Sequence, residues 1–156
     1  MSFVYFYTPI GEMGVGVEEE RITRIFLPGE IPQQREVAQE TPLHRKAIEQ
    51  IREYLAGKRQ VFDLPLAAKG TQFQEKVWQA LQQIPYGQKT SYQEIACMIG
   101  NPKACRAVGS ANRSNPIPLI IPCHRVIGKD GSLTGFGGGL PLKEWLINME
   151  ENHVEM

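Results

Sequence analysis

The chain has 156 residues, of which 42% are hydrophobic and 22% charged, a composition typical of a folded globular protein rather than a disordered or fibrous one. The formal net charge is zero, which excludes a strongly basic nucleic-acid-binding protein at the level of the whole chain. The longest nearly uncharged stretch, residues 114–123, contains three prolines and is too short to cross a bilayer. The N-terminus lacks the basic segment and cleavage site of a secretory signal, so we expect a cytoplasmic protein with no membrane span.

Basic residues are concentrated in the middle of the chain. Residues 69–130 contain eight Lys and Arg against three Asp and Glu, whereas residues 1–68 contain eight against ten and residues 131–156 one against four. A local basic surplus suits contact with nucleic-acid phosphates. Ordinary variation of surface charge explains it equally well, so the distribution alone does not decide.

The three cysteines, Cys97, Cys105 and Cys123, form no CxxC pair, and no histidine lies near them at zinc-finger spacing. An odd number of cysteines leaves at least one thiol free. The pattern predicts neither a disulfide framework nor a structural metal site, and we expect no metal and no cofactor.

The chain begins with a pattern of short strands. Residues 3–8 and 13–27 are rich in β-branched and aromatic residues, interrupted by glycine and a charge cluster, which is typical of a small antiparallel sheet. Residues 28–40, with their proline, glycine and polar side chains, have the composition of a loop.

A helix is predicted next. Thr41 and Pro42 suit an N-cap and a first-turn proline, and the apolar residues that follow keep to one helical face until Gly57. Residues 61–64 suit a short strand, and residues 66–70 have the composition of a linker. We therefore expect a domain boundary near residue 68.

The second half opens with two helix-start signals. Thr71 and Gln74 form a capping-box pair ahead of apolar residues at helical spacing. Ser91 and Glu94 form a second such pair, after a Pro-Tyr-Gly turn, and the helix that they begin is expected to end at Gly100.

A further helix follows closely. Asn101 and Pro102 suit its cap and its first turn, and the helix is expected over residues 103–112. Two short helices joined by a tight turn are the helix-turn-helix pattern, and the small side chains of the second would let its backbone approach a DNA groove. From the pattern alone, an αα-hairpin packed in a core is the favoured interpretation.

These elements predict an α+β protein in two parts. Residues 1–68 form a small antiparallel sheet with a helix, and residues 69–156 form a mostly helical domain with the helix-turn-helix. The last helix carries Trp145, Leu146 and Met149, for which we expect a role in core packing.

The segment before Cys123 is the first sign of chemistry. Residues 117–122, a stiff apolar run with two prolines, present the thiol at a fixed place. Positive charge from the neighbouring His124 and Arg125 would favour the nucleophilic thiolate. An isolated Cys-His pair is more often structural, so this pair needs further support.

The support is a resemblance to the O6-alkylguanine-DNA alkyltransferase family. Residues 115–128, NPIPLIIPCHRVIG, resemble the active-site signature of that family, whose core is Pro-Cys-His-Arg-Val. Three other runs resemble the family in the same order, namely residues 91–94, 101–109 and 138–145. The resemblance is strong over residues 70–150 and general before them.

The resemblance implies a set of catalytic residues. Cys123 would accept the alkyl group, His124 would take the thiol proton through a water, and Glu144 would stabilise the charged imidazole. Tyr92 would donate a hydrogen bond or proton to the departing guanine. Asn115 would order the turn that holds the helix-turn-helix against the active-site segment.

It also implies a DNA-binding surface for double-stranded DNA that contains O6-alkylguanine. Because the target atom is stacked inside the duplex, the nucleotide must be flipped out, and Arg106 matches the arginine that fills the gap. The other positions that match DNA-binding residues of the family are Lys103, Ala104, Ser91 and Arg113.

The glycine-rich residues 134–139 neither follow a strand of a βαβ unit nor include a Walker lysine, which argues against a nucleotide site. The resemblance makes this loop one side of the guanine pocket, with Phe136 as an aromatic gate and the Gly137 amide facing O6. Val126 and Arg125 would complete the pocket.

Taken together, the resemblance implies a monomer that moves an alkyl group irreversibly from O6-alkylguanine, and from O4-alkylthymine as a second substrate, to its own Cys123, once per molecule. Family members that bind zinc use N-terminal cysteines, which this chain lacks. Three alternatives remain for experiment: a lesion-binding protein without transfer, which would lack the nucleophile; a helix-turn-helix regulator, which would leave the Cys-His-Arg run unexplained; and a cysteine hydrolase, which adjacent side chains in an extended segment would not suit.

Overall fold

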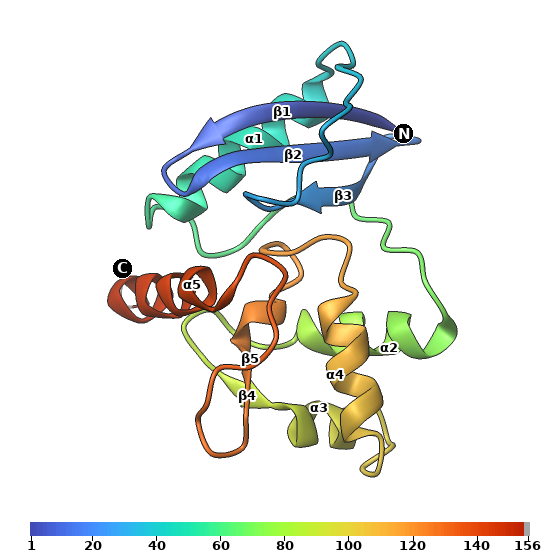
Figure 1. Cartoon of the computed structure of the whole chain (residues 1–156), viewed down its shortest axis with the longest axis vertical. Helices are drawn as coiled ribbons and strands as arrows, with labels where there is room; N and C mark the ends of the chain where they lie inside the picture. Colours follow the sequence, from blue (N-terminus) through green and yellow to red (C-terminus); the bar gives the residue numbers. More distant parts are fainter. Residues whose placement is uncertain (155–156) are drawn as a thin grey trace.

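The computed structural model describes residues 1–154 and has two layers of structure stacked along its long axis (Figure 1). An antiparallel sheet with one helix forms one layer, and four helices form the other, which confirms the predicted α+β class. The elements in chain order are β1 Ser2–Thr8, β2 Gly11–Glu18, β3 Arg21–Phe26, α1 Pro42–Leu55, α2 Gln72–Leu81, β4 Thr90–Ser91, α3 Tyr92–Met98, α4 Cys105–Arg113, the 3₁₀ turn η1 Cys123–Arg125, β5 Val126–Ile127 and α5 Leu140–His153.

The N-terminal sheet has the order β1-β2-β3, and both pairs are antiparallel. The charge cluster predicted to interrupt the strands does so, because Glu19 and Glu20 form the β2–β3 turn with φ angles of 51° and 61°. The central strand β2 is buried over residues 13–17, since α1 packs on the sheet. The strand pattern of the sequence is confirmed here.

Helix α1 begins as predicted. The Thr41 side chain accepts a hydrogen bond from the His44 backbone, and Pro42 occupies the first turn. The C-cap is Ala56, followed by Gly57 at a φ of 74°, a left-handed conformation that glycine adopts at little cost. The strand predicted at residues 61–64 is absent from the described structure; Leu66 instead forms an isolated bridge with Ile22 at the exposed edge of β3.

The helix-turn-helix consists of α3 and α4, which contact each other and α2. Helix α4 begins at Cys105 with Ala104 as its N-cap, so the predicted start at residue 103 with an Asn101 cap is wrong. The reason is local: Asn101 accepts a hydrogen bond from the Ala104 amide (3.0 Å) and closes a turn instead of capping a helix. The Thr71–Gln74 capping box of α2 is complete, as predicted.

The last helix, α5, packs against η1 and buries Leu146 and Met149. Trp145 does not share that role, because it lies on the outer face with 40% of its surface exposed. Within residues 1–154 no helix has both the length and the apolar character needed to cross a membrane. The two layers meet where the Ile25 amide of β3 donates to the Pro116 carbonyl (2.9 Å), directly ahead of the cysteine segment.

Candidate active site

The segment that leads to Cys123 is a buried loop closed by Asn115. The Asn115 side chain donates to the Ile121 carbonyl (2.8 Å) and accepts from the Ile117 amide (3.0 Å). Leu119, at the loop's apex, has a φ of 71°, a conformation that a branched side chain adopts only when its surroundings enforce it. Asn115 therefore fixes the shape of the segment, consistent with the ordering role expected for it.

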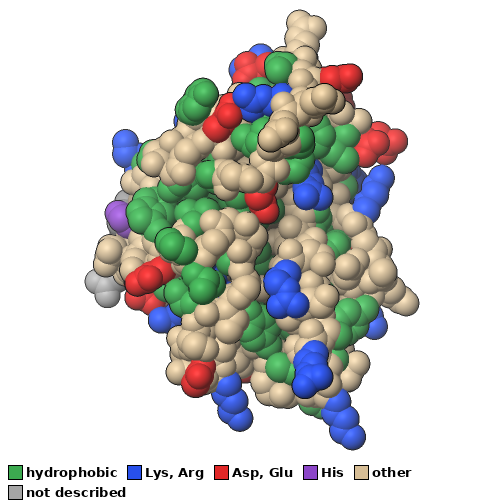
Figure 2. Space-filling model, in the orientation of Figure 1, with side chains coloured by type: hydrophobic (Ala, Val, Ile, Leu, Met, Phe, Trp, Pro, Cys, Tyr) green, Lys and Arg blue, Asp and Glu red, His purple; other side chains and the backbone are tan. Residues whose placement is uncertain are grey.

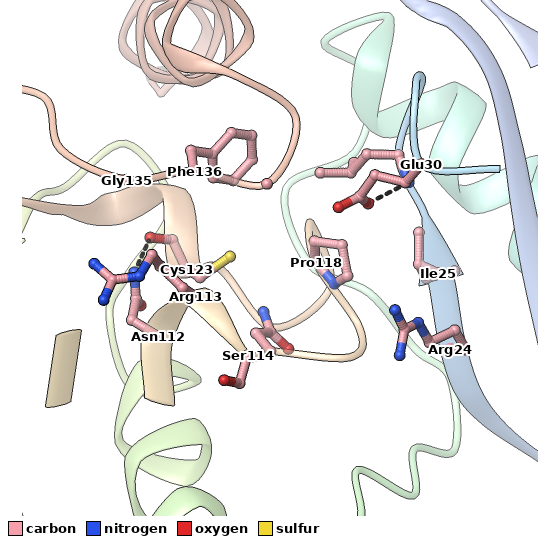
Figure 3. A pocket seen from close by; sticks show the side chains of 13 residues that line it. Arg24, Ile25, Glu30, Asn112, Arg113, Ser114, Pro118, Cys123, Gly135 and Phe136 are labelled. Atoms are coloured by element: carbon pink, nitrogen blue, oxygen red, sulfur yellow. Dashed lines mark hydrogen bonds between the residues drawn. The ribbon is translucent and has the colours of Figure 1, made fainter. Parts of the chain in front are cut away.

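Cys123 lies at the side of a pocket of about 270 Å³, and its residue is 5% exposed (Figure 3). The pocket lies between β3, α4 and the glycine-rich loop. The prediction that Cys123 and His124 lie in an extended segment is wrong, because Cys123 begins the 3₁₀ turn η1. Figure 3 shows the sulfur pointing into the pocket, toward Pro118 and Glu30.

The free thiol is held in its neutral form. Burial raises the pKa of Cys123 to about 11, and the Asn115 side chain and the charge of Lys143 oppose this only in part. The expectation that Arg125 would favour the thiolate is wrong, because that guanidinium is engaged elsewhere. Deprotonation at neutral pH therefore needs a base near the sulfur.

The carboxylate that holds His124 is Glu150, and the assignment of Glu144 is wrong. His124 Nε2 lies 2.6 Å from a Glu150 carboxylate oxygen, and both side chains are buried. Glu144 is exposed on the same helix, because only the face of α5 that bears Lys143, Leu146 and Glu150 turns inward. Sequence spacing could not separate the two glutamates without the packing of α5 on η1.

Tyr54 of α1 joins this pair from the N-terminal layer. Its hydroxyl donates to Glu150 and lies 3.1 Å from His124 Nε2, and the residue is completely buried. Burial and the neighbouring carboxylate raise the pKa of Tyr54 well above its usual value, so it stays a donor. With Nε2–H facing Glu150, Nδ1 is the unprotonated nitrogen, and it has no hydrogen-bond partner within residues 1–154. Sequence reasoning missed Tyr54, which is 70 residues from His124.

Arg125 was expected to line the base pocket, but it lies outside it. Its guanidinium donates hydrogen bonds to the Glu150 carboxylate through Nε (2.8 Å) and Nη2 (3.0 Å), and it also donates to the Ile84 carbonyl (2.7 Å). Burial would raise the pKa of Glu150, but hydrogen bonds and charge from His124 and Arg125 lower it to about 2. Because Arg125 is permanently cationic, Glu150 is ionised even when His124 is neutral.

Val126 is likewise absent from the residues around the pocket. It is fully buried in β5, where it pairs with Thr90 of β4. Phe136 and Gly137 do line the pocket, and their roles toward the guanine stay predictions. The Tyr92 hydroxyl lies 2.6 Å from that of Thr134, so Tyr92 contacts the start of the glycine-rich loop rather than the pocket around the thiol.

Lys143 is a further buried group near the thiol. It belongs to the family-like run 138–145, but the sequence predicted no role for it. Its side chain is inaccessible to solvent, and Nζ donates to the Thr134 carbonyl (2.8 Å). Burial lowers the pKa of Lys143 to about 8, and the charge of Cys123 counteracts the shift. A cation held there stabilises negative charge on the sulfur.

Three of the expected DNA-binding side chains are exposed along or beside α4. Lys103 and Arg106 are exposed near the start of α4 and Arg113 near its end, and none of them forms an ion pair within residues 1–154. Figure 2 shows Lys and Arg side chains over α4 and the end of the molecule below it. Ala104 caps this helix by position, while the Ser91 hydroxyl accepts from the Glu94 amide at the start of α3.

Two family models match the chain. The model described as 6-O-methylguanine DNA methyltransferase, DNA binding domain, matches residues 72–152. The model described as 6-O-methylguanine DNA methyltransferase, ribonuclease-like domain, matches residues 1–68. The first model alone spans more than half of the chain.

Individual relatives are similar over nearly their whole length. The constitutive methylated-DNA–protein-cysteine methyltransferase of Bacillus subtilis is 50% identical over 150 residues, which is 92% of this chain and 91% of the relative. A methylated-DNA–protein-cysteine methyltransferase of Methanosarcina barkeri is 47% identical and covers 94% and 95%. Among solved structures, Mycobacterium tuberculosis OGT in complex with DNA superposes with a TM-score of 0.90 at 40% identity, covering 98% and 94% of the two chains.

Proposed function

Because the chain belongs to the O6-methylguanine DNA methyltransferase family, we propose that it repairs O6-alkylguanine in duplex DNA by transferring the alkyl group to Sγ of its own Cys123. O4-alkylthymine is a second substrate of the same chemistry. The observation that supports this most directly is the position of Cys123, which faces a pocket beside a buried His124–Glu150 pair. The relatives' names and the DNA-bound solved structure point to the same activity.

The helix-turn-helix brings the lesion to the pocket. Lys103, in the turn before helix α4, and Arg106, in its first turn, face the phosphates and the base stack, while Arg113 at the end of the helix lies beside the pocket. Flipping the alkylated guanine out of the stack carries it from the exposed face of α4 toward Cys123, and Arg106 fills the space that it leaves. Phe136 and the Gly137 backbone then hold the base.

Transfer requires a proton to leave the thiol first. His124 accepts it at Nδ1 through a water, and Glu150 stabilises the resulting imidazolium through Nε2–H. Lys143 offsets the thiolate charge. The sulfur attacks the alkyl carbon in line, the S–C bond forms as the C–O6 bond breaks, and the bonding electrons pass to the guanine. The guanine takes up one proton to leave as a neutral base. Tyr92, which contacts the start of the pocket-lining glycine-rich loop through Thr134, is the proposed donor, and solvent restores its proton.

The product is a thioether, which water does not hydrolyse, so each chain acts once as a monomer. No group of three or more His, Cys, Asp or Glu side chains in residues 1–154 could hold a metal ion. We treat residues 1–68 and 69–156 as two domains, a division supported by the separate family matches. The cytoplasmic location stays a prediction.

Intact-protein mass spectrometry after incubation with duplex DNA that holds one O6-methylguanine tests the proposal. We expect the mass of one methyl group per chain, absent from the Cys123→Ala variant and never exceeded with excess DNA. Lesion binding without a mass gain would support a lesion-binding protein, and neither gain nor preference for the lesion would leave a regulator. Repeated turnover of an ester would identify a hydrolase.

A further inference from the structure

The side of the pocket opposite Cys123 is formed by the N-terminal domain. Ile25, Leu27 and Glu30, from β3 and the turn after it, lie around the same pocket as the cysteine. Figure 3 shows the Glu30 carboxylate pointing into the pocket, toward the side from which the sulfur enters. The mechanism above does not use this charged group.

Glu30 is held in place by its own turn. One carboxylate oxygen accepts from the Leu27 amide (2.9 Å), and the Glu30 amide donates to the Leu27 carbonyl (3.0 Å). Gly29 permits this tight turn with a φ of 88°. A side chain fixed through one oxygen presents the other oxygen in a constant direction.

The second oxygen faces the glycine-rich loop across the pocket. A Cβ atom placed on Gly137 would lie 2.6 Å from Oε2 of Glu30, which is too close, so a side chain at this position would displace the carboxylate. On the next residue, a Cβ on Gly138 would lie 3.2 Å from the Leu27 side chain. The turn around Glu30 and the loop therefore close on each other, and the glycines leave room for the carboxylate between them.

Burial is the main cause of the raised pKa of the Cys123 thiol, and the charge of Glu30 adds a smaller contribution in the same direction, so the carboxylate acts on the sulfur electrostatically. Glu30 is exposed in the free protein. A flipped base would cover the pocket and exclude water from around the carboxylate, which strengthens its interactions with any charge on the alkyl group.

We propose that Glu30 makes this protein select alkyl groups by charge, accepting neutral groups on guanine O6 and disfavouring anionic ones such as carboxymethyl. The inference rests on the proposed function. An anionic substituent on the alkyl carbon would extend into a space that already holds the fixed Glu30 carboxylate, whereas a neutral group of the same size would meet no repulsion. Arg24 and Arg113 also lie around the pocket, form no ion pair with Glu30 in the described structure and would attract an anionic group. The proposal therefore requires the fixed Glu30 carboxylate to outweigh them, and the change in the rate ratio of Glu30→Gln isolates its contribution.

The experiment compares two nearly isosteric substrates. Single-turnover rates are measured on duplexes with O6-carboxymethylguanine and O6-carbamoylmethylguanine, which differ in charge and little in size. Both react with the same thiol, so the ratio of the two rates cancels any effect of Glu30 on the pKa of Cys123. We expect the wild type to favour the neutral group, and Glu30→Gln to reduce that preference by about fivefold, a screened Coulomb effect.

Glu40→Gln is the matched control, because it removes one exposed carboxylate from the same connecting segment without touching the pocket. An unchanged ratio in Glu30→Gln overturns the inference. So does an equal change in Glu40→Gln, which would mean that net charge acts through DNA binding. If the wild type transfers neither the carboxymethyl nor the carbamoylmethyl group, the size of the alkyl group decides, and this result also overturns the inference. No transfer from O6-methylguanine would instead refute the proposed function.

Discussion

Replacing Glu150 by Gln is expected to damage both stability and transfer. The Glu150 carboxylate accepts hydrogen bonds from the buried side chains of His124, Arg125 and Tyr54 and from the half-buried Gly87 amide. An amide keeps the shape but loses the charge and one acceptor oxygen. Arg125 is then left buried without its counter-ion.

The magnitude follows from the pKa. The cluster lowers the pKa of Glu150 from 4.5 to about 2, and at 1.36 kcal/mol per unit this makes ionised Glu150 worth about 3 kcal/mol to the folded state. For a chain of this size we expect Glu150→Gln to melt about 6–12 °C below the wild type at pH 7. Transfer should slow by at least about tenfold, since His124 loses the group that stabilises its charged form.

The pH dependence has a definite sign. A carboxyl whose pKa is lowered by folding stabilises the protein above its unfolded pKa, and this stabilisation is lost as the pH falls from about 4.5 to about 2. The stability difference between wild type and Glu150→Gln, measured by urea unfolding, should therefore shrink over that range. The exposed Glu144→Gln variant is the control, with a change within about 0.5 kcal/mol and a normal rate. A large loss in Glu144→Gln with a mild effect in Glu150→Gln would refute the reasoning.

Two further variants test the remaining groups. Tyr54→Phe leaves Glu150 with one donor fewer, so urea unfolding should show a loss of about 1–2 kcal/mol and the pH profile of transfer should move; an unchanged profile would mean that Tyr54 only fills space. Arg106→Ala should weaken base flipping, measured with a fluorescent base beside the lesion, by about tenfold at unchanged thermal stability, because its side chain is exposed. Equal loss on an already unpaired lesion would contradict that role.

The chemistry of this protein could be predicted from a short run of sequence, because it depends on adjacent residues. Cys123, His124 and the rigid segment before them are contiguous, and the loop that Asn115 closes spans only six residues. The helix starts at Thr41 and Thr71 were equally local, since an N-cap and its partner lie three residues apart. Local interactions of this kind leave a pattern that sequence reasoning can detect.

What the tertiary structure decided were choices between groups far apart in the chain. Glu144 and Glu150 are both plausible partners for His124 by sequence, and only the face that α5 turns toward η1 selects Glu150. Tyr54 and Glu30 reach the site from the N-terminal layer, and they are 70 residues from His124 and 93 residues from Cys123 in the sequence, respectively. Their contacts depend on how the two layers dock. Docking is set by the packing of apolar surfaces, and such packing leaves no pattern at a fixed sequence spacing from which the contacting residues could be predicted.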